Sequence, residues 1–195
     1  MRDLMKWLVV LTCGFATTPL LAGENCVDES IDYLALDFMA FDQDMDGGWR
    51  TIAENPACVA AAADVIEWYR LHKPELSAGM QSSLAWHEGQ LRAAAGQTAT
   101  AIELFKQTFK PAEADFFGWN YYVAATIAFL EQDREALIEQ RTKLAALEKP
   151  SDFNPTDSEG NPMDIPWPPN LNVVDSFIQC FGKSYREAYG DCKQD

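Results

Sequence analysis

Apolar residues recur along most of this chain at spacings of three and four positions. One series runs from Val27 to Phe41, and another, from Val59 to Tyr69, follows Pro56. Residues three or four apart share one face of an α-helix, and Pro is well tolerated in a helix's first turn. A sustained alternation of apolar and polar residues, which would indicate strands, is absent. The pattern therefore predicts an all-α protein with little or no sheet.

The middle of the chain contains four more segments with this helical spacing. They cover about residues 77–95, 98–109, 119–130 and 133–147. Gly96 and the Lys110-Pro111 pair separate them, and Gly and Pro both end helices. Because the breaks are short, neighbouring helices are expected to pack as antiparallel hairpins, either in an ordinary bundle or in a stacked array.

Residues 149–170 differ from the rest because they hold six of the ten prolines. A helix is excluded there, since Pro lacks the backbone N–H and clashes with the preceding turn. Ile165 and Trp167 are apolar, so we expect this long loop to pack on the helical body. A C-terminal helix is predicted to follow over residues 171–192.

Residues 1–22 have the features of a secretory signal peptide. Arg2 and Lys6 precede an apolar stretch, and Ala22 supplies a small residue at the predicted cleavage site. Pro19 and nearby threonines interrupt the stretch, which favours a cleaved leader over a membrane span of about 20 apolar residues. The remaining residues, 23–195, would form one helical domain, periplasmic or secreted, without membrane insertion.

Cleavage leaves an even number of cysteines: Cys26, Cys58, Cys180 and Cys192. In an exported chain this count favours two disulfides, and three pairings are possible. We prefer Cys26–Cys58 and Cys180–Cys192. On one straight helix the second pair would lie about 18 Å apart, so that bond requires a chain reversal, which Gly182 or Gly190 could supply.

Small residues recur in the helical pairs. Gly89, Gly96, Ala101 and Phe105 are spaced 7, 5 and 4 positions apart, and 35 residues later Ala124 and Ala136 correspond to Gly89 and Ala101. Over about Ser77–Lys149 this arrangement resembles a tetratricopeptide repeat, in which two helices cross closely and an aromatic residue packs between them. The second copy has Gln140 in place of Phe105, and Ala85 and Arg92 stand where the repeat usually has Trp and Tyr.

The resemblance implies a short superhelix with a concave face that binds a protein or peptide. Such repeats bind through the first helix of each pair, which here offers Trp86, His87, Gln90, Trp119, Asn120 and Tyr121. The aromatic residues among them could instead belong to the hydrophobic core.

The chain has 30 acidic and 15 basic residues, a net charge of −15, which argues against nucleic-acid or anionic-membrane partners. With 48% hydrophobic residues it can bury a real core. The negative charge would favour a basic partner and speed its encounter.

Asp42, Asp44 and Asp46, followed by Gly47, resemble the start of an EF-hand loop. Oxygen ligands at positions 1, 3 and 5 suit calcium, and Gly at position 6 suits the turn. Position 12 should be a bidentate Glu but is Ala53. Calcium binding is therefore one hypothesis, and a solvated acidic turn is the alternative.

Features that indicate catalysis are few. Ser83 and His87 share a helix face, but a hydrolytic triad usually draws its members from different elements. His72 and His87 lack metal-ligand spacing, and no glycine-rich phosphate loop occurs. The leading hypothesis is thus an exported, non-enzymatic scaffold without a cofactor. A calcium-binding domain and an enzyme of unknown class are the alternatives, and the oligomeric state stays open.

Overall fold

The computed structural model describes residues 26–156, 160–190 and 192, so the predicted signal peptide lies outside the described residues. Regular structure in these ranges is helical, apart from one isolated bridge between Thr156 and Pro162. The α-helices are α1 (Arg50–Ala53), α2 (Val59–His72), α3 (Ala78–Ala94), α4 (Thr98–Lys106), α5 (Trp119–Leu130), α6 (Arg134–Ala145), α7 (Leu171–Gln179) and α8 (Tyr185–Gly190). The predicted all-α class is confirmed.

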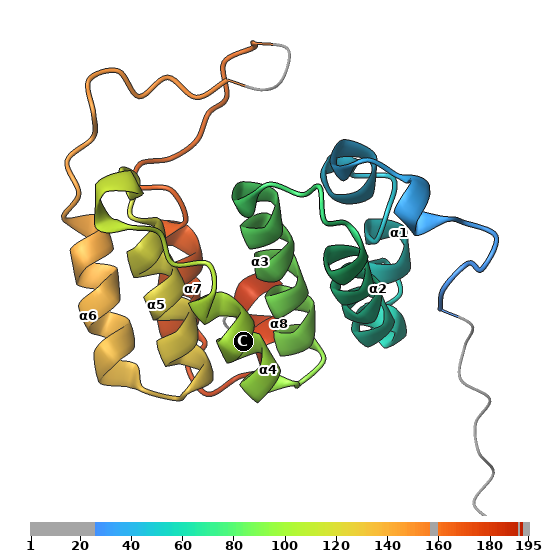
Figure 1. Cartoon of the computed structure of the whole chain (residues 1–195). Helices are drawn as coiled ribbons and strands as arrows, with labels where there is room; N and C mark the ends of the chain where they lie inside the picture. Colours follow the sequence, from blue (N-terminus) through green and yellow to red (C-terminus); the bar gives the residue numbers. More distant parts are fainter. Residues whose placement is uncertain (1–25, 157–159, 191, 193–195) are drawn as a thin grey trace, which may run out of the picture.

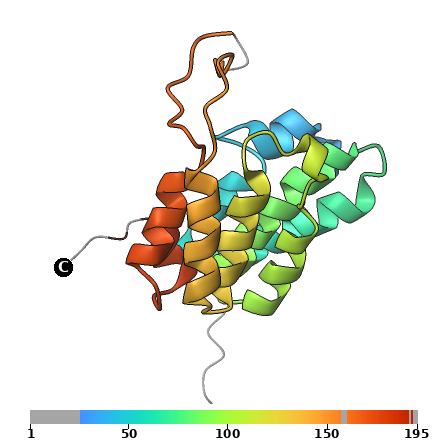
Figure 2. The same cartoon turned by 90° about the vertical axis from the view of Figure 1, so that its left-hand side faces the viewer.

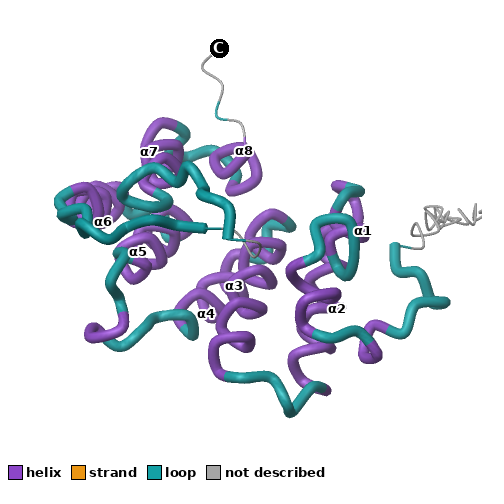
Figure 3. The backbone as a smooth tube through the Cα atoms, turned by 90° about the horizontal axis from the view of Figure 1, so that it is seen from above, coloured by secondary structure: helices purple, strands orange, loops and turns teal. Residues whose placement is uncertain are grey.

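The helices pack as consecutive antiparallel pairs, with α3 in the middle (Figure 1). Helix α2 lies on one side of α3. On the other side lies α4, which forms a hairpin with α3, and the α5–α6 hairpin comes next. Helix α7 packs on α5 and α6, and α8 returns to contact α3. Viewed from above, α1 and α8 stand on opposite sides of a space that α3 borders (Figure 3).

Capping side chains fix several of the predicted helix starts. The Ser77 hydroxyl accepts a hydrogen bond from the Met80 N–H at 3.3 Å, and the Asp133 carboxylate accepts one from the Ala136 N–H at 2.9 Å. Each bond satisfies one of the free N–H groups in a helix's first turn. Helices α3 and α6 therefore begin where the sequence predicts.

The predicted helix over Val27–Phe41 is wrong. This segment holds only a single 3₁₀ turn, η1 (Tyr33–Ala35), and the start of a π-helical turn, η2 (Met39–Gln43). The carboxylates of Asp28, Asp32 and Asp37 accept hydrogen bonds from backbone N–H groups two or three residues ahead. Such local bonds compete with the helical ladder, so the apolar spacing alone does not sustain a helix.

The predicted single helix over 171–192 is divided into α7 and α8. Gly182, with a φ of +87°, reverses the chain between them, a conformation that costs glycine little. The reversal brings the Cα atoms of Cys180 and Cys192 within 5.9 Å, and those of Cys26 and Cys58 lie 5.4 Å apart. Both predicted disulfides are confirmed.

The proline-rich loop packs on the body only at its base. The Trp167 indole Nε1–H donates to the Leu147 carbonyl at 2.9 Å, and its ring lies 4.8 Å from the Phe153 ring. The middle of the loop projects away from the helices in two perpendicular views (Figures 1 and 2). The expected packing therefore holds for Trp167 but not for the whole segment.

Helices α3 and α4 approach closely at Gly89. A Cβ atom added there would lie 2.7 Å from a ring carbon of Phe105, which is fully buried. The turn between the two helices closes at Gly96, with a φ of +79°. The small-residue interpretation of this hairpin is thus correct, and the aromatic ring does fill the crossing.

Charged groups join α3 to α2 on the other side. The buried Glu88 carboxylate accepts hydrogen bonds from Arg70 at 2.9 and 2.8 Å, and Arg92 pairs with Asp64 and Glu67. Burying a carboxylate is costly unless it is paired, so Arg70 is what permits Glu88 in this position.

Substituting Gly89 tests the close approach. We expect Gly89→Ala to lower the free energy of unfolding by about 1–3 kcal/mol, because the methyl group overlaps the Phe105 ring. Gly79→Ala, in the same helix, would place its methyl group in ordinary contact with the Ser77 hydroxyl at 3.9 Å and should stabilise by about 0.5–1 kcal/mol through helix propensity. Urea unfolding measures both, and a stabilising Gly89→Ala would contradict the packing.

Removing the buried carboxylate tests the α2–α3 contact. Glu88→Ala leaves Arg70 without its partner in a mostly buried position, and we expect a loss of about 3–5 kcal/mol. Glu103→Ala breaks the exposed pair with Lys106 and should change stability little, because exposed ion pairs are screened by solvent. Similar losses in the two variants, measured by urea unfolding, would mean that Glu88 has no special role.

Candidate functional site

A pocket of about 380 Å³ opens beside the middle of α3. It is lined by residues from several separate segments: Gln43, Arg50, Ser82, Ser83, Trp86, His87, Lys110, Trp119, Tyr122, Asn170 and Tyr189. A second pocket of about 460 Å³ shares Arg50, His87 and Tyr189 with it. This pocket extends along α3 to Gln90 and Ala94 and is also lined by Arg186 of α8. We call the two together the α3 groove.

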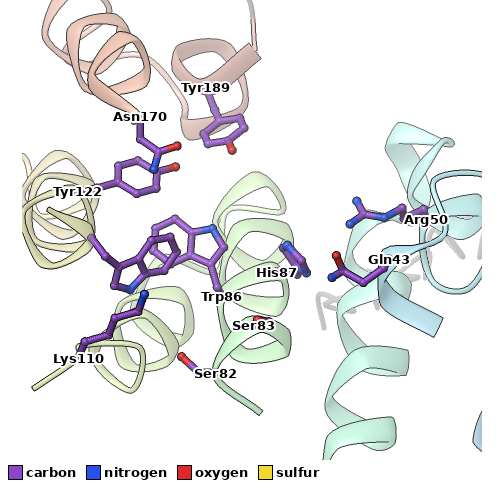
Figure 4. Close-up of a pocket in the computed structure, with 11 residues that line it drawn as sticks. Gln43, Arg50, Ser82, Ser83, Trp86, His87, Lys110, Tyr122, Asn170 and Tyr189 are labelled. Carbon is purple, nitrogen blue, oxygen red and sulfur yellow. The ribbon is translucent and has the colours of Figure 1, made fainter. Parts of the chain in front are cut away.

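The floor of the groove is formed by packed aromatic rings. The Trp86 side chain lies at its centre, with ring centroids 4.6 Å from Trp119 and 5.0 Å from Tyr122 (Figure 4). Trp86 is only 5% exposed and also contacts Phe105 of the core. The floor is therefore continuous with the core, and it offers a preformed apolar surface rather than mobile side chains.

A buried carboxylate organises one wall. Asp42 in η2 is fully buried, and its Oδ1 lies 2.7 Å from the His87 Nδ1 and accepts a hydrogen bond from the Trp49 indole at 2.9 Å. These bonds attach the η2–α1 segment to α3. In the close-up view His87 lies between Trp86 and the side chains of Gln43 and Arg50 (Figure 4).

The same bonds fix the protonation state of Asp42. Burial by itself raises its pKa, but the hydrogen bonds from His87, Trp49 and Gln43 and the charge of His87 outweigh burial, so the pKa lies below its ordinary value of 3.8. The ionised carboxylate can only accept, so the His87 Nδ1 carries the proton that it donates. The other ring nitrogen, Nε2, forms no hydrogen bond with the described residues, so it is available to a ligand.

Arg50 is held where the two pockets meet. Its Nε–H and Nη2–H donate to the Asp42 backbone carbonyl at 3.1 and 2.9 Å, and its guanidinium carbon lies 4.3 Å from the centre of the Trp49 ring. Stacking and bidentate bonding restrict the planar guanidinium to one orientation. The cation is thereby positioned in advance of any ligand.

Four of the six binding residues predicted from the sequence do line the groove: Trp86, His87, Gln90 and Trp119. Asn120 and Tyr121 are not among its lining residues. The Asn120 amide instead bonds the backbone N–H and C=O of Lys110, each at 2.8 Å, and Tyr121 packs against the core. Both point away because consecutive residues of a helix face directions about 100° apart.

Sequence reasoning missed the groove residues that come from other segments, among them Arg50, Lys110, Asn170 and Tyr189. No spacing links them, because they lie in four separate parts of the chain. The cations were the one available indication, since basic residues are scarce in this acidic protein.

The structure does not gather the carboxylates of the suspected calcium loop. Asp42 is buried against His87, and the Asp44 carboxylate accepts a hydrogen bond from the Asp46 N–H at 3.0 Å. Among the described residues, no group of three or more His, Cys, Asp or Glu side chains could hold a metal ion. The loop acts here as a turn with an internal cap.

Ser83 and His87 both line the first pocket, but no hydrogen bond joins them within the described part of the chain. The partner of His87 comes from Asp42, 45 residues away, and not from its own helix. The arrangement thus orients an imidazole beside the pocket, without the nucleophile-to-base contact that a triad requires.

Comparison of the chain with protein-family models, with curated proteins and with solved structures gives no match. The tetratricopeptide resemblance is therefore supported only at the level of paired, consecutive helices. Over the described ranges, no helix is both long and apolar enough to cross a membrane.

The pH dependence of stability tests the role of Asp42. Because its pKa is lower in the folded than in the unfolded state, its ionised form stabilises the fold above about pH 4, and this contribution is lost as the pH falls through the folded pKa. We expect Asp42→Asn to lower the free energy of unfolding by about 1.5–3 kcal/mol at neutral pH, and by less near pH 3.

The measurement is urea unfolding of both proteins across that pH range. Asp152→Asn, which alters an exposed carboxylate in the proline-rich loop, serves as the control and should change stability little at any pH. A loss from Asp42→Asn that stays constant with pH would show that the charge of Asp42 is unimportant.

Proposed function

We propose that this protein is an exported, non-enzymatic binding scaffold that holds a peptide segment of a partner protein in the α3 groove. The observation that carries the proposal is the continuity of the groove, in which two pockets share Arg50, His87 and Tyr189 along the length of α3. An elongated channel suits an extended chain better than a compact small molecule.

The chemistry of the lining also suits a peptide. Trp86 and Tyr122 are only 5% and 2% exposed, so the aromatic floor offers a small apolar contact, and the polar side chains of the lining surround it. The side chains of Ser82, Ser83 and Asn170 form no hydrogen bond with the described part of the protein, so they can bond a peptide backbone. Fixed apolar contacts and available polar groups together give both affinity and register.

The disulfides support the export half of the proposal. Cys26–Cys58 and Cys180–Cys192 bonds persist in oxidising compartments and are rare in the cytosol. With the predicted leader at residues 1–22, they favour a periplasmic or secreted location.

Blocking the groove tests this function. Peptides selected from a random 12-residue library displayed on phage provide the ligands, and fluorescence titration measures their binding to the purified protein. Ser83→Trp places an indole in the first pocket and should weaken binding by at least about tenfold, since the occupied volume is no longer available.

Ile138→Trp provides the matched control, because it adds an exposed indole on α6 at a position that is 40% exposed, outside the groove. Circular dichroism confirms that both variants fold. If the selected peptides bind the blocked protein as well as they bind the parent, or if no peptide is selected, the proposed function is wrong.

A further inference from the structure

The α3 groove carries a charge opposite to that of the whole molecule. Its lining includes three cations, Arg50, Lys110 and Arg186, together with His87, and no Asp or Glu lines either pocket. The full chain has twice as many acidic as basic residues, 30 against 15. If the groove had the same composition as the whole chain, it would contain more carboxylates than cations. The groove is therefore depleted of negative charge.

The three groove cations also lack carboxylate partners among the described residues. Arg50 donates to the backbone carbonyl of Asp42, Arg186 donates to that of Pro56 at 3.1 Å, and Lys110 lies over the Trp119 ring with Nζ 5.4 Å from its centre. Six other Lys and Arg residues of the described ranges do pair with Asp or Glu: Arg70, Lys73, Arg92, Lys106, Arg141 and Lys143.

These two observations indicate that the groove cations are kept available for a charge that the protein itself does not supply. Outside the groove, six of the nine other Lys and Arg residues in the described ranges have an acidic partner, whereas none of the three groove cations has one. Arg50 and Arg186 are instead positioned by neutral carbonyl groups, which orient a guanidinium without neutralising it. Guanidinium groups held in this way can bind a carboxylate through two parallel hydrogen bonds.

The buried carboxylate behind the wall does not cancel this charge. Asp42 is fully buried and already accepts hydrogen bonds from His87, Trp49 and Gln43. The Asp42 carboxylate is therefore already bonded to side chains of the protein itself. A ligand in the groove faces the cations directly.

The net charge of −15 acts on a different length scale. At physiological salt the Debye length is about 8 Å, so distant surface carboxylates slow the approach of an acidic ligand but contribute little once it is in contact. Ion pairs at about 3–4 Å in a partly desolvated groove then decide affinity. Overall charge thus favours a basic partner at long range, and the groove favours an acidic one on contact.

We propose that the peptide bound in the α3 groove is acidic, with carboxylate side chains contacting Lys110 at one end, Arg50 in the middle and Arg186 at the other end. This inference rests on the proposed peptide-binding function and adds the chemistry of the partner. Apolar residues between the carboxylates would lie on the Trp86 floor.

Two peptide libraries test the proposal against the intact, disulfide-bonded protein. Both are random 12-residue libraries in which four spaced positions are fixed, as Glu in one and as Lys in the other. We expect the immobilised protein to retain the Glu library at least tenfold better than the Lys library. We also expect this preference to decrease as sodium chloride is raised, because ion pairs are screened.

Charge-reversal variants locate the effect. Lys110→Glu combined with Arg186→Glu should reduce retention of the Glu library at least tenfold. Arg134→Glu combined with Lys149→Glu is the matched control, since these exposed cations also lack described carboxylate partners but lie outside the groove. The control should change retention less than threefold. Arg50 is left intact because it also bonds Asp42.

Each other outcome is informative. Preferential retention of the Lys library, blocked by Ser83→Trp, would overturn the acidic-ligand proposal and leave the peptide-binding function standing. Equal losses in the two double variants would place the charge effect outside the groove and would overturn the acidic-ligand proposal as well.

Retention of neither library would count against peptide binding itself. Oligogalacturonate, an acidic sugar, is tested as a further ligand. If it alone binds, the groove is a site for acidic sugars, and both proposals are overturned.

Discussion

The crowded packing around the middle of α3 is the constraint on which the rest of the structure depends. Three consecutive residues there, His87, Glu88 and Gly89, contact three different neighbours. Glu88 pairs with Arg70 of α2, Gly89 admits the Phe105 ring of α4, and His87 bonds Asp42 of the η2 turn. Because successive side chains of a helix diverge by about 100°, one short stretch can hold three segments in fixed positions around one axis.

The groove depends on the contact between His87 and Asp42 and on the return of α8 to α3. Helix α3 forms its base, the η2–α1 segment is held on one side through Asp42, and α8 returns on the other side after the chain reverses at Gly182. The Cys180–Cys192 disulfide fixes the return. Aromatic rings shared with the core line the floor, so the floor of the groove is packed as closely as the interior beneath it.

The cations that line the groove indicate the kind of ligand that its shape could hold. Cations such as Arg70 and Arg92 are neutralised by carboxylates of the protein. Arg50 and Arg186 are instead oriented by backbone carbonyls, which do not neutralise their charge. In the proposed function these two charge distributions would have separate effects: the acidic surface would repel nucleic acid at long range, and the cationic groove would select an acidic ligand on contact. Net charge alone is therefore a poor guide to the ligand of a small site.

The sequence alone determined most of the central helices and where they end. Apolar spacing, the Ser77 and Asp133 caps, the proline-rich break and the cysteine count predicted α2 to α6, the loop and both disulfides. These are local properties, since a cap or a helical face depends on residues only three or four positions apart. Local bonding also explains the error at Val27–Phe41, where aspartate caps override apolar spacing.

Only the tertiary structure decided what the site is made of. Asp42 and His87 are 45 residues apart, and Arg50, Lys110 and Tyr189 belong to different segments, so no periodicity connects them. Of the residues predicted from the sequence, Trp86, His87 and Gln90 of α3 and Trp119 of α5 do line the groove. Asn120 and Tyr121 occupy neighbouring positions on α5 but face elsewhere, because the direction of a side chain matters only once the helix is packed against its neighbours.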